Sequence, residues 1–353
     1  MPLKSLAGAH TALVTPFLPN GFVDWSGFRN NIRFQLSQGM SGLVPAGTTG
    51  ESPTLDWCEH NKLIDTVIET ADGRCVVVAG AGSNSTDEAL MASRHAAEAG
   101  ADGLLLVDCY YNGPSTLELR REYHGRIAAA CPGCVVIPYI IPGRSGTALS
   151  PEDLAILAAE HPNVTAVKEA TGDIERMALT RSLVGPKFEI MSGDDGITCQ
   201  IMLDERIRAN GVISVTSNVA PAAVAAMAAA ALAGDKDRAA EIHRALTPLF
   251  DVVTVIVPNP RRMPDGSVRV VKDKFRNPLA IKALMGGLGM PSGHCRQPLG
   301  KMTANGLDMV RSAARTTWEN ARWVLQPIED AYGVDLDKRI NDDACWRTFA
   351  YDE

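Results

Sequence analysis

The sequence has few of the features that mark nucleic-acid-binding, membrane or secreted proteins. Its 353 residues carry a net charge of −7 without a long acidic or basic run, so neither nucleic acid nor an anionic membrane is an expected partner. No apolar stretch approaches the roughly 20 residues that span a membrane. The N-terminal segment also lacks the apolar core of a signal peptide. We therefore expect a cytoplasmic protein.

Disulfide and metal chemistry also find little support. The eight cysteines are scattered along a long chain and do not suggest a disulfide framework. The "CPGC" at 131–134 has the spacing of a redox motif but no second pair for zinc, so we predict a structural role for it. Asp194 and Asp195 could bind a divalent ion, yet the seven histidines are scattered and no ligand cluster forms. We expect neither a metal nor a cofactor.

What the sequence does contain is a regular alternation of short apolar runs and helix-like stretches. The runs cover residues 11–17, 42–47, 75–82, 103–111, 134–141, 164–170, 188–195 and 211–218. Helix signals lie between them, such as Ser150 as an N-cap followed by Pro151. Continuous apolar strands separated by helices predict a parallel sheet that is covered on both faces. Eight units in about 220 residues match a closed (β/α)8 TIM barrel.

A doubly wound dinucleotide-binding fold is the alternative. It requires a glycine fingerprint near its start. In the nearest candidate, "GAGSNS" from Gly80, Ser85 stands where the third glycine should be. The barrel is therefore the favoured interpretation.

On this interpretation residues 1–230 form the barrel and residues 231–353 form a C-terminal helical region. Valine-rich runs on either side of Pro264–Gly266 predict a β-hairpin inserted at about 251–276. Trp318, Trp323 and Leu325 lie on a helical stretch near the C-terminus, which indicates that the tail docks on the protein.

We expect the hairpin and the tail to pack on the C-terminal helices, far from the barrel mouth, and to extend a subunit interface. A mobile surface insertion without a partner is the alternative.

Candidate catalytic residues lie where the strands end, which is where barrel enzymes place them. Lys168 ends the apolar run "VTAVKEA". Burial disfavours the ammonium form, lowers the pKa and provides a neutral amine that can attack a ketone to form a Schiff base. A structural lysine paired with an acid such as Glu169 is the alternative.

The other strand ends have motifs that decide between these alternatives. They are "GTTGES" at 47–52, "YYN" at 110–112, "Y-x-x-P-x-R-x-G" at 139–146, "KEATGD" at 168–173, "SGDD" at 192–195 and "GVISVTSNVAP" at 211–221. In this order they resemble the dihydrodipicolinate synthase and N-acetylneuraminate lyase family of class I aldolases. The resemblance covers about residues 5–250 and resumes at "NPLAIKALMGGLGM" and "CRQPLGKM".

The resemblance implies a role for each matching residue. Lys168 would form an imine with pyruvate, and Thr48 and Thr49 would hold the pyruvate carboxylate. Hydroxyl groups beside glycine-rich backbone suit such an anion. Gly193 and the backbone of Ile213 are expected to line the pyruvate pocket.

The resemblance also implies a hydroxyl relay that moves protons during the reaction. Its members would be Tyr139, Thr48 and Tyr111. Tyr111 is similar to a tyrosine that reaches in from a neighbouring subunit, so a homodimer or homotetramer is expected.

Arg144 favours one second substrate within the family. A carboxylate calls for a bidentate guanidinium, and the resemblance implies condensation of pyruvate with L-aspartate 4-semialdehyde in lysine and diaminopimelate biosynthesis. Ile140 and Gly143 depart from the commoner pattern, which has Asn and Ser there. Another pyruvate-dependent aldolase or lyase, acting on a sugar acid or 2-oxo acid, stays open. A non-catalytic barrel that acts as a binding protein is a further alternative.

Four more residues resemble a lysine-binding allosteric pocket of inhibited relatives. They are His60, Asn84, Glu88 and Tyr110. Trp57 stands where some of these relatives have histidine, so the match is partial. An ordinary polar dimer interface is the alternative.

Overall fold

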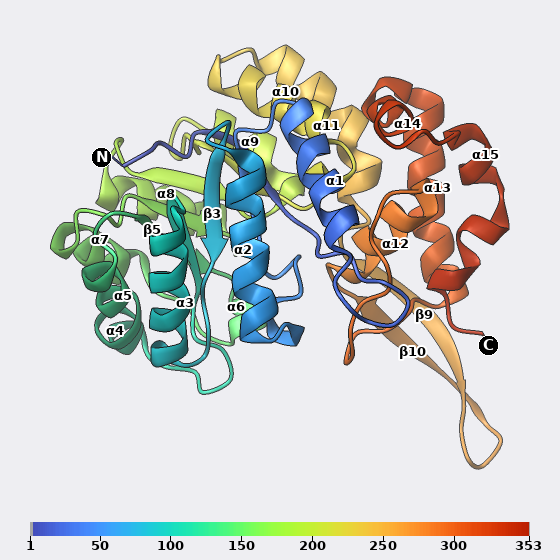
Figure 1. Ribbon diagram of the computed structural model, residues 1–353, viewed down its shortest axis with the longest axis horizontal. Coiled ribbons are helices and arrows are strands. Elements are labelled where there is room, and N and C mark those ends of the chain that lie inside the picture. Colours follow the sequence, from blue (N-terminus) through green and yellow to red (C-terminus); the bar gives the residue numbers. More distant parts are fainter. Residues whose placement is uncertain (1–2, 353) are drawn as a thin grey trace.

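The computed structural model describes residues 3–352, and its central feature is a closed barrel of eight parallel strands (Figure 1). Neighbouring strands follow the order of the chain, and β8 pairs with β1 to close the barrel. The strands are β1 Gly8–Ala12, β2 Gly42–Val44, β3 Val76–Gly80, β4 Gly103–Val107, β5 Val135–Ile140, β6 Ala166–Glu169, β7 Glu189–Ser192 and β8 Gly211–Ser214. The predicted (β/α)8 barrel is confirmed.

Helices cover the outside of the barrel. They are α1 Trp25–Ser37, α2 Trp57–Ala71, α3 Thr86–Ala99, α4 Thr116–Glu118, α5 Gly125–Ala130, α6 Pro142–Ser145, α7 Pro151–Glu160, α8 Ile174–Val184, α9 Thr198–Leu203 and α10 Pro221–Leu232, with a π-helical segment Leu119–His124 between α4 and α5. Ser150 caps α7 as predicted, accepting a hydrogen bond from the Asp153 N–H at 3.1 Å.

The first strand differs from its prediction. β1 begins at Gly8 and ends at Ala12, whereas the sequence indicated 11–17. Gly8 pairs with Gly211 of β8, and a Cβ at Gly211 would lie 1.9 Å from the Gly8 carbonyl oxygen, so only a glycine allows this close start. The segment after Ala12 leaves the barrel and contacts the C-terminal region. The Phe17 N–H donates to the Ser292 carbonyl at 3.1 Å.

Alternating side chains of the strands fill the barrel interior and the layer beneath the helices. Tyr139, Met191 and Ile213 belong to the interior cluster, whereas Ile140 packs in the outer cluster with the helices. Tyr139 lies directly beside Lys168 in the β5–β6 register. The interior beneath the carboxyl ends of the strands is therefore closed by apolar side chains.

The C-terminal region forms a second group of elements beside the barrel (Figure 1). It consists of α11 Lys236–Phe250, β9 Val255–Arg262, β10 Val268–Phe275, α12 Leu279–Leu288, α13 Ala304–Asn320, α14 Gln326–Tyr332 and α15 Leu336–Asn341. No helix within residues 3–352 combines the length and the apolar character that a membrane crossing requires.

The tail docks on the protein, as predicted. Trp318 and Leu325 are buried, although Trp323 is 45% exposed. The Tyr332 hydroxyl of α14 donates to Asn31 of α1 at 2.8 Å, and Trp346 packs on Gly287 of α12, where a Cβ would lie 2.5 Å from the indole ring. Glycine at 287 thus makes room for the tail.

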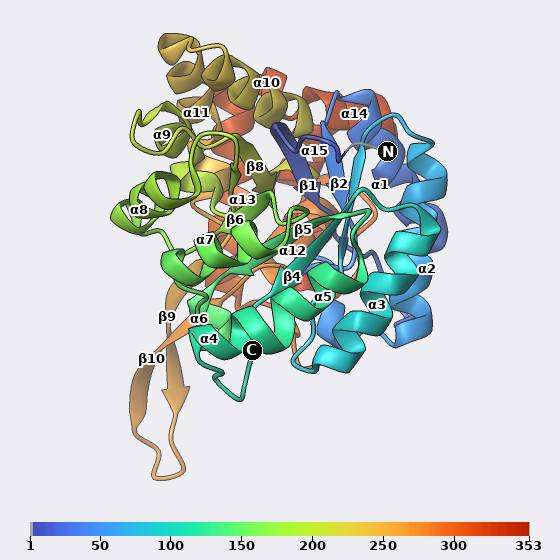
Figure 2. The same ribbon diagram turned by 90° about the vertical axis from the view of Figure 1, so that its left-hand side faces the viewer.

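The predicted hairpin is confirmed, with strands longer than the valine-rich runs. Its base packs on the C-terminal helices, because β9 contacts α13 and buries Val255, Val257 and Asn259 on one face. Its tip extends away from the rest of the molecule (Figure 2).

The expectation that the hairpin lies far from Lys168 is wrong for its base. Thr254 before β9 and Lys274 near the end of β10 line the same cavity as Lys168. The reason is that the two strands join α11 and α12, whose facing ends lie at the barrel mouth, so the base of the hairpin must start there.

The expected subunit interface stays a prediction. Ile256, Val268 and Val270 lie on one face of the hairpin and are 52%, 64% and 69% exposed. Exposed apolar faces of this kind mark interaction sites. We expect Val268→Ser with Val270→Ser to lower the molecular mass measured by light scattering while pyruvate binding is kept.

Val271→Ser, on the opposite face of β10, is the matched control and should leave the mass unchanged. An unchanged mass for the double variant would instead support a hairpin tip without a partner.

Candidate active site

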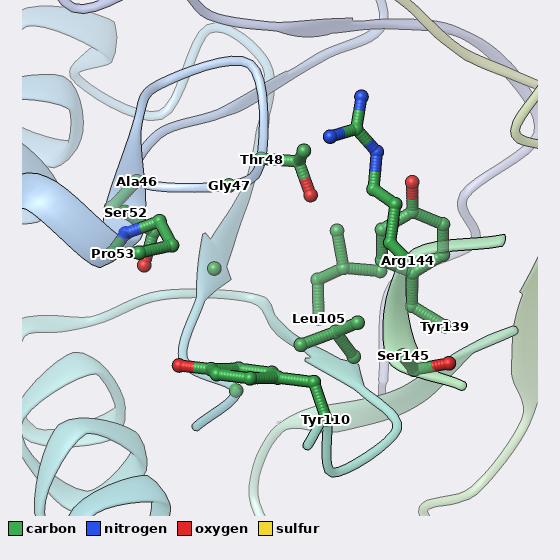
Figure 3. A pocket seen from close by; sticks show the side chains of 13 residues that line it. Ala46, Gly47, Thr48, Ser52, Pro53, Leu105, Tyr110, Tyr139, Arg144 and Ser145 are labelled. Carbon is green, nitrogen blue, oxygen red and sulfur yellow. The ribbon is translucent and has the colours of Figure 1, made fainter. Parts of the chain in front are cut away.

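The carboxyl ends of the barrel strands open into a cavity of about 540 Å³. Barrel residues that line it include Thr49, Tyr139, Arg144, Lys168, Gly193, Asp194 and Asp195, and the C-terminal region adds Thr254, Lys274, Arg276 and Asn277. A smaller cavity of about 220 Å³ shares Tyr139 and Arg144 with it. Figure 3 shows Thr48, Tyr139 and Arg144 grouped on one side of the smaller cavity, with the ring of Tyr110 across the other.

Lys168 is buried near the end of β6 and has no carboxylate partner within residues 3–352. The residue is only 5% exposed to solvent, and its Nζ lies 4.2 Å from the centre of the Tyr139 ring. Glu169 turns to the other side of the strand and pairs with Arg176 at 3.2 Å. The alternative of a structural Lys168–Glu169 ion pair is therefore wrong.

Burial sets the protonation of this lysine. Desolvation lowers the pKa of Lys168 to about 7, with Asp195 raising it and Arg144 lowering it further. A lysine with this pKa is a neutral amine in a large fraction of molecules at neutral pH, whereas an ordinary lysine is almost entirely protonated. The site can therefore supply a nucleophilic amine.

Asp195 was considered in the sequence only as a metal ligand, and the structure gives it another position. Its carboxylate accepts hydrogen bonds from the N–H groups of Val215 and Thr216 at 3.0 and 2.8 Å. Burial raises the pKa of Asp195, and these bonds act against that rise. The carboxyl group is near enough to Lys168 to raise the pKa of the amine. The second acid of "SGDD" is thus part of the electrostatic environment of the amine, which spacing alone does not reveal.

Gly193 makes room for the lysine. A Cβ at this position would lie 2.7 Å from the Ala170 Cβ and 3.1 Å from the Lys168 Cε. Any larger residue would displace the lysine chain or the backbone after β6. The structure thus brings Gly193 and Lys168 together, as the sequence indicated.

Tyr139 supplies a protonated hydroxyl beside Lys168. Burial raises the pKa of Tyr139 to about 12, against the opposing effects of Arg144 and the Thr48 hydroxyl. The phenol is therefore neutral across the physiological range and can both donate and accept a hydrogen bond.

The C-terminal region holds the "GTTGES" loop in place. Asn277 donates to the Thr49 hydroxyl at 2.9 Å. Glu51, which has a left-handed backbone with φ 59°, accepts from Lys282 of α12 at 2.6 Å, and both side chains are buried. Lys282 also donates to the Thr15 carbonyl at 3.0 Å.

Sequence reasoning missed this buried Lys282–Glu51 pair. Its signal was a lysine inside the apolar stretch "NPLAIKALMGG", since a buried lysine needs a partner.

Arg144 lies on α6 above the cavity. Its Nη2 donates to the Asn277 carbonyl at 2.8 Å. Of the two departures from the family pattern, Ile140 lies outside the cavity lining and Gly143 is part of it. Ile140 points away from the barrel interior into the outer core, and Gly143 is exposed. Loss of Asn at position 140 therefore removes no polar group from the cavity.

Three predicted site residues do not line the cavity that contains Lys168. Tyr111 is 92% exposed with φ 80°, and it lines neither cavity within the chain. Ile213 is buried in the barrel interior and does not line the cavity, which Val215 does instead. Thr48 lines the smaller cavity, on the Tyr139 side.

The candidate allosteric residues are close together but differ in environment. Burial raises the pKa of Tyr110, and Glu88 and Asn84 are near enough to affect it. Glu88 accepts from the Ser83 hydroxyl at 2.6 Å. His60 is buried, with its Nε2 2.8 Å from the Gly80 carbonyl, so this ring nitrogen is already engaged.

Comparison with known proteins agrees with this geometry. The sequence pattern of the dihydrodipicolinate synthetase family matches residues 5–266. The chain belongs to this family. The match includes every barrel strand and ends within the hairpin.

Named relatives of the family are similar over most of the chain. A 4-hydroxy-tetrahydrodipicolinate synthase from Methanococcus maripaludis strain C6 is 39% identical over 297 residues, which are 84% of this chain and 93% of the relative. The chloride-inhibited dihydrodipicolinate synthase from Acinetobacter baumannii, solved in complex with pyruvate, is 32% identical with TM-score 0.79, covering 89% and 99% of the two chains. The enzyme from Cyanidioschyzon merolae, solved with lysine bound, is 34% identical with TM-score 0.78, covering 88% and 98%.

The lowered pKa of Lys168 predicts a pH profile for imine formation by this family member. The neutral amine is abundant above pH 7 and falls about tenfold for each pH unit below it. We expect the initial rate of borohydride-trappable imine formation with pyruvate to rise from pH 5.5 and level off above about pH 8. Asp195→Asn, which removes a charge that favours the ammonium form, should move the midpoint to lower pH.

The pH profile distinguishes a lysine with a lowered pKa from an ordinary lysine. A rate that keeps rising towards pH 10 in the unaltered protein would show that the amine has its ordinary pKa.

Proposed function

We propose that the protein condenses pyruvate with L-aspartate 4-semialdehyde to form 4-hydroxy-tetrahydrodipicolinate, as a lyase of the class I aldolase type in lysine and diaminopimelate biosynthesis. The observation that carries this proposal is the buried Lys168, which faces a cavity and has no ion-pair partner among the described residues, in a chain of this family. The similarity to 4-hydroxy-tetrahydrodipicolinate synthases supports the same reaction.

Imine formation begins with the neutral amine of Lys168. The nitrogen attacks C2 of pyruvate, the oxygen leaves as water, and a protonated imine remains. Tyr139, whose ring lies against the Lys168 amine, is placed to pass the protons that this exchange requires, and Thr48 links it to the loop at 47–52. Loss of a proton from the pyruvate methyl group then gives an enamine, because the imine nitrogen accepts the electron pair.

The enamine carbon attacks the aldehyde carbon of the second substrate and forms the new carbon–carbon bond. The amino group of that substrate then attacks the imine carbon, closes the ring and releases Lys168. We assign the pyruvate carboxylate to the loop that contains Thr49, opposite Gly193, and the carboxylate of the second substrate to Arg144.

Tyr111 can join the relay only through a second subunit. Its 92% exposure within one chain suits a residue that contacts a partner, and this supports the proposed homodimer or homotetramer. The size of the oligomer and the cytoplasmic location stay predictions.

The alternatives have less support. A non-catalytic barrel has no need of a buried amine, a phenol and a guanidinium around one cavity, and Lys168, Tyr139 and Arg144 all line it. A lyase acting on a sugar acid has less use for Arg144 at the mouth.

The decisive experiment is borohydride reduction in the presence of pyruvate, followed by peptide mapping and by an assay with aspartate semialdehyde. We expect a single pyruvyl adduct on Lys168, and none in Lys168→Met. Lys282, the second buried lysine among the described residues, is the internal control, because its nitrogen is bonded to Glu51 at 2.6 Å and lines neither cavity. An adduct on another lysine, or the absence of any adduct, would refute the mechanism.

We also propose that L-lysine inhibits the enzyme at a subunit interface that includes His60, Asn84, Glu88 and Tyr110, of which the last three lie near one another. A carboxylate, an amide and a phenol suit an amino-acid ligand, and one similar structure has lysine bound. We expect millimolar L-lysine to reduce activity at least about twofold, and Glu88→Gln to relieve this inhibition, since a charge-assisted bond is lost. Activity that L-lysine does not change would favour an ordinary polar interface.

A further inference from the structure

Two arginines hold the two sides of the cavity mouth together. Arg144 of α6 donates from Nη2 to the Asn277 carbonyl at 2.8 Å, and Arg276 donates from Nη1 to the Gly143 carbonyl at 2.7 Å. Each arginine thus bonds the backbone next to the other arginine. This exchange brings two guanidinium groups to one edge of the cavity.

Both arginines have most of their hydrogen-bonding capacity free. A guanidinium has five N–H donors. Within residues 3–352, each of these two uses one of them in a protein hydrogen bond. Holding the two sides of the mouth together requires only the backbone hydrogen bond that each arginine already makes. The remaining N–H donors are therefore available to a ligand.

The mouth also has an excess of unpaired positive charge. Lys274, Arg144 and Arg276 line both the Lys168 cavity and an adjoining cavity of about 570 Å³. In the described part of the chain none of the three forms an ion pair. Of the five acids that line these cavities, Asp273 pairs with Arg261 at 2.5 Å, Glu51 pairs with Lys282 at 2.6 Å, and Asp195 accepts from backbone N–H groups. Asp194, which accepts from the Gly196 N–H at 3.2 Å, and Asp251 form no ion pair in the described residues, so three unpaired cations face two unpaired acids.

Two of these cations, Lys274 and Arg276, come from a part of the chain that the family pattern does not cover. The family match ends at residue 266, and the sequence resemblance resumes at Asn277. Lys274 and Arg276 lie in between, at the end of β10 and directly after it. They are therefore features of this protein's inserted hairpin.

We propose that Arg276 is a second substrate-binding residue, which together with Arg144 binds the carboxylate of the aldehyde substrate. This inference rests on the proposed condensation reaction. Two guanidiniums on one carboxylate would offset the like charges that the hairpin brings to the mouth. Lys274, more exposed on the same wall, adds to the field that attracts the anion.

The test compares Arg276→Met and Arg276→Lys with the unaltered enzyme. We expect Arg276→Met to raise the KM for aspartate semialdehyde about tenfold or more, because a charge-assisted contact is lost. The KM for pyruvate and the yield of borohydride-trapped adduct should stay within about twofold. Arg276→Lys keeps the charge and should recover part of the loss.

Lys272→Met is the matched control, since it removes the same charge from an exposed position of β10 that lines neither cavity. It should leave both KM values unchanged. An unchanged KM for the aldehyde in Arg276→Met would overturn the inference. A loss of pyruvate trapping as large as the effect on the aldehyde would also overturn it, because Arg276 would then only hold the two sides of the mouth together.

A binding measurement separates this inference from the proposed function. Succinate is titrated calorimetrically into enzyme whose Lys168 has been reduced onto pyruvate, and Arg276→Met should weaken its binding about tenfold or more. If the unaltered enzyme forms the adduct but does not condense the aldehyde, while succinate binding still depends on Arg276, the proposed second substrate is wrong and the anion site stands. Succinate binding that does not depend on Arg276 would overturn the site itself.

Discussion

The site depends on one constraint, which is the burial of an amine without a carboxylate partner. Water would keep Lys168 protonated, and an acid in contact with it would do the same. The barrel provides the alternative environment: apolar side chains close the interior below the amine, Tyr139 lies beside it and Gly193 leaves room for its chain. Asp195, held by backbone N–H groups, lies close enough to moderate the shift in pKa.

The barrel mouth is built from both parts of the chain. The loop that contains Thr49 and Glu51 is bonded to Asn277 and to Lys282 of α12, so the pyruvate side of the cavity rests on the C-terminal helices. Loss of one partner of a buried ion pair costs about 3–5 kcal/mol, since the other charge stays buried and uncompensated. The C-terminal region is therefore part of the active site as well as a possible surface for assembly.

The inserted hairpin changes the electrostatics of that mouth. Arg144 on α6 lies within the part of the chain that the family pattern matches, whereas Lys274 and Arg276 lie outside it. Added cations at the entrance of a cavity with low-dielectric walls concentrate anions there. Selection among aldehyde substrates can thus differ in this protein without any change to the residues around Lys168.

The sequence by itself determined the barrel, the hairpin and the motifs at the strand ends, because apolar periodicity and turn residues act over short distances along the chain. It also indicated Lys168, Tyr139 and Arg144, because strand ends of a parallel barrel meet at one edge. It could not decide whether Lys168 pairs with Glu169, where β1 begins, or that Arg276 faces Arg144 across the mouth. Those features depend on which way neighbouring side chains point and on contacts such as Lys282 with Glu51, 231 residues apart, and only the closed tertiary structure brings such residues together.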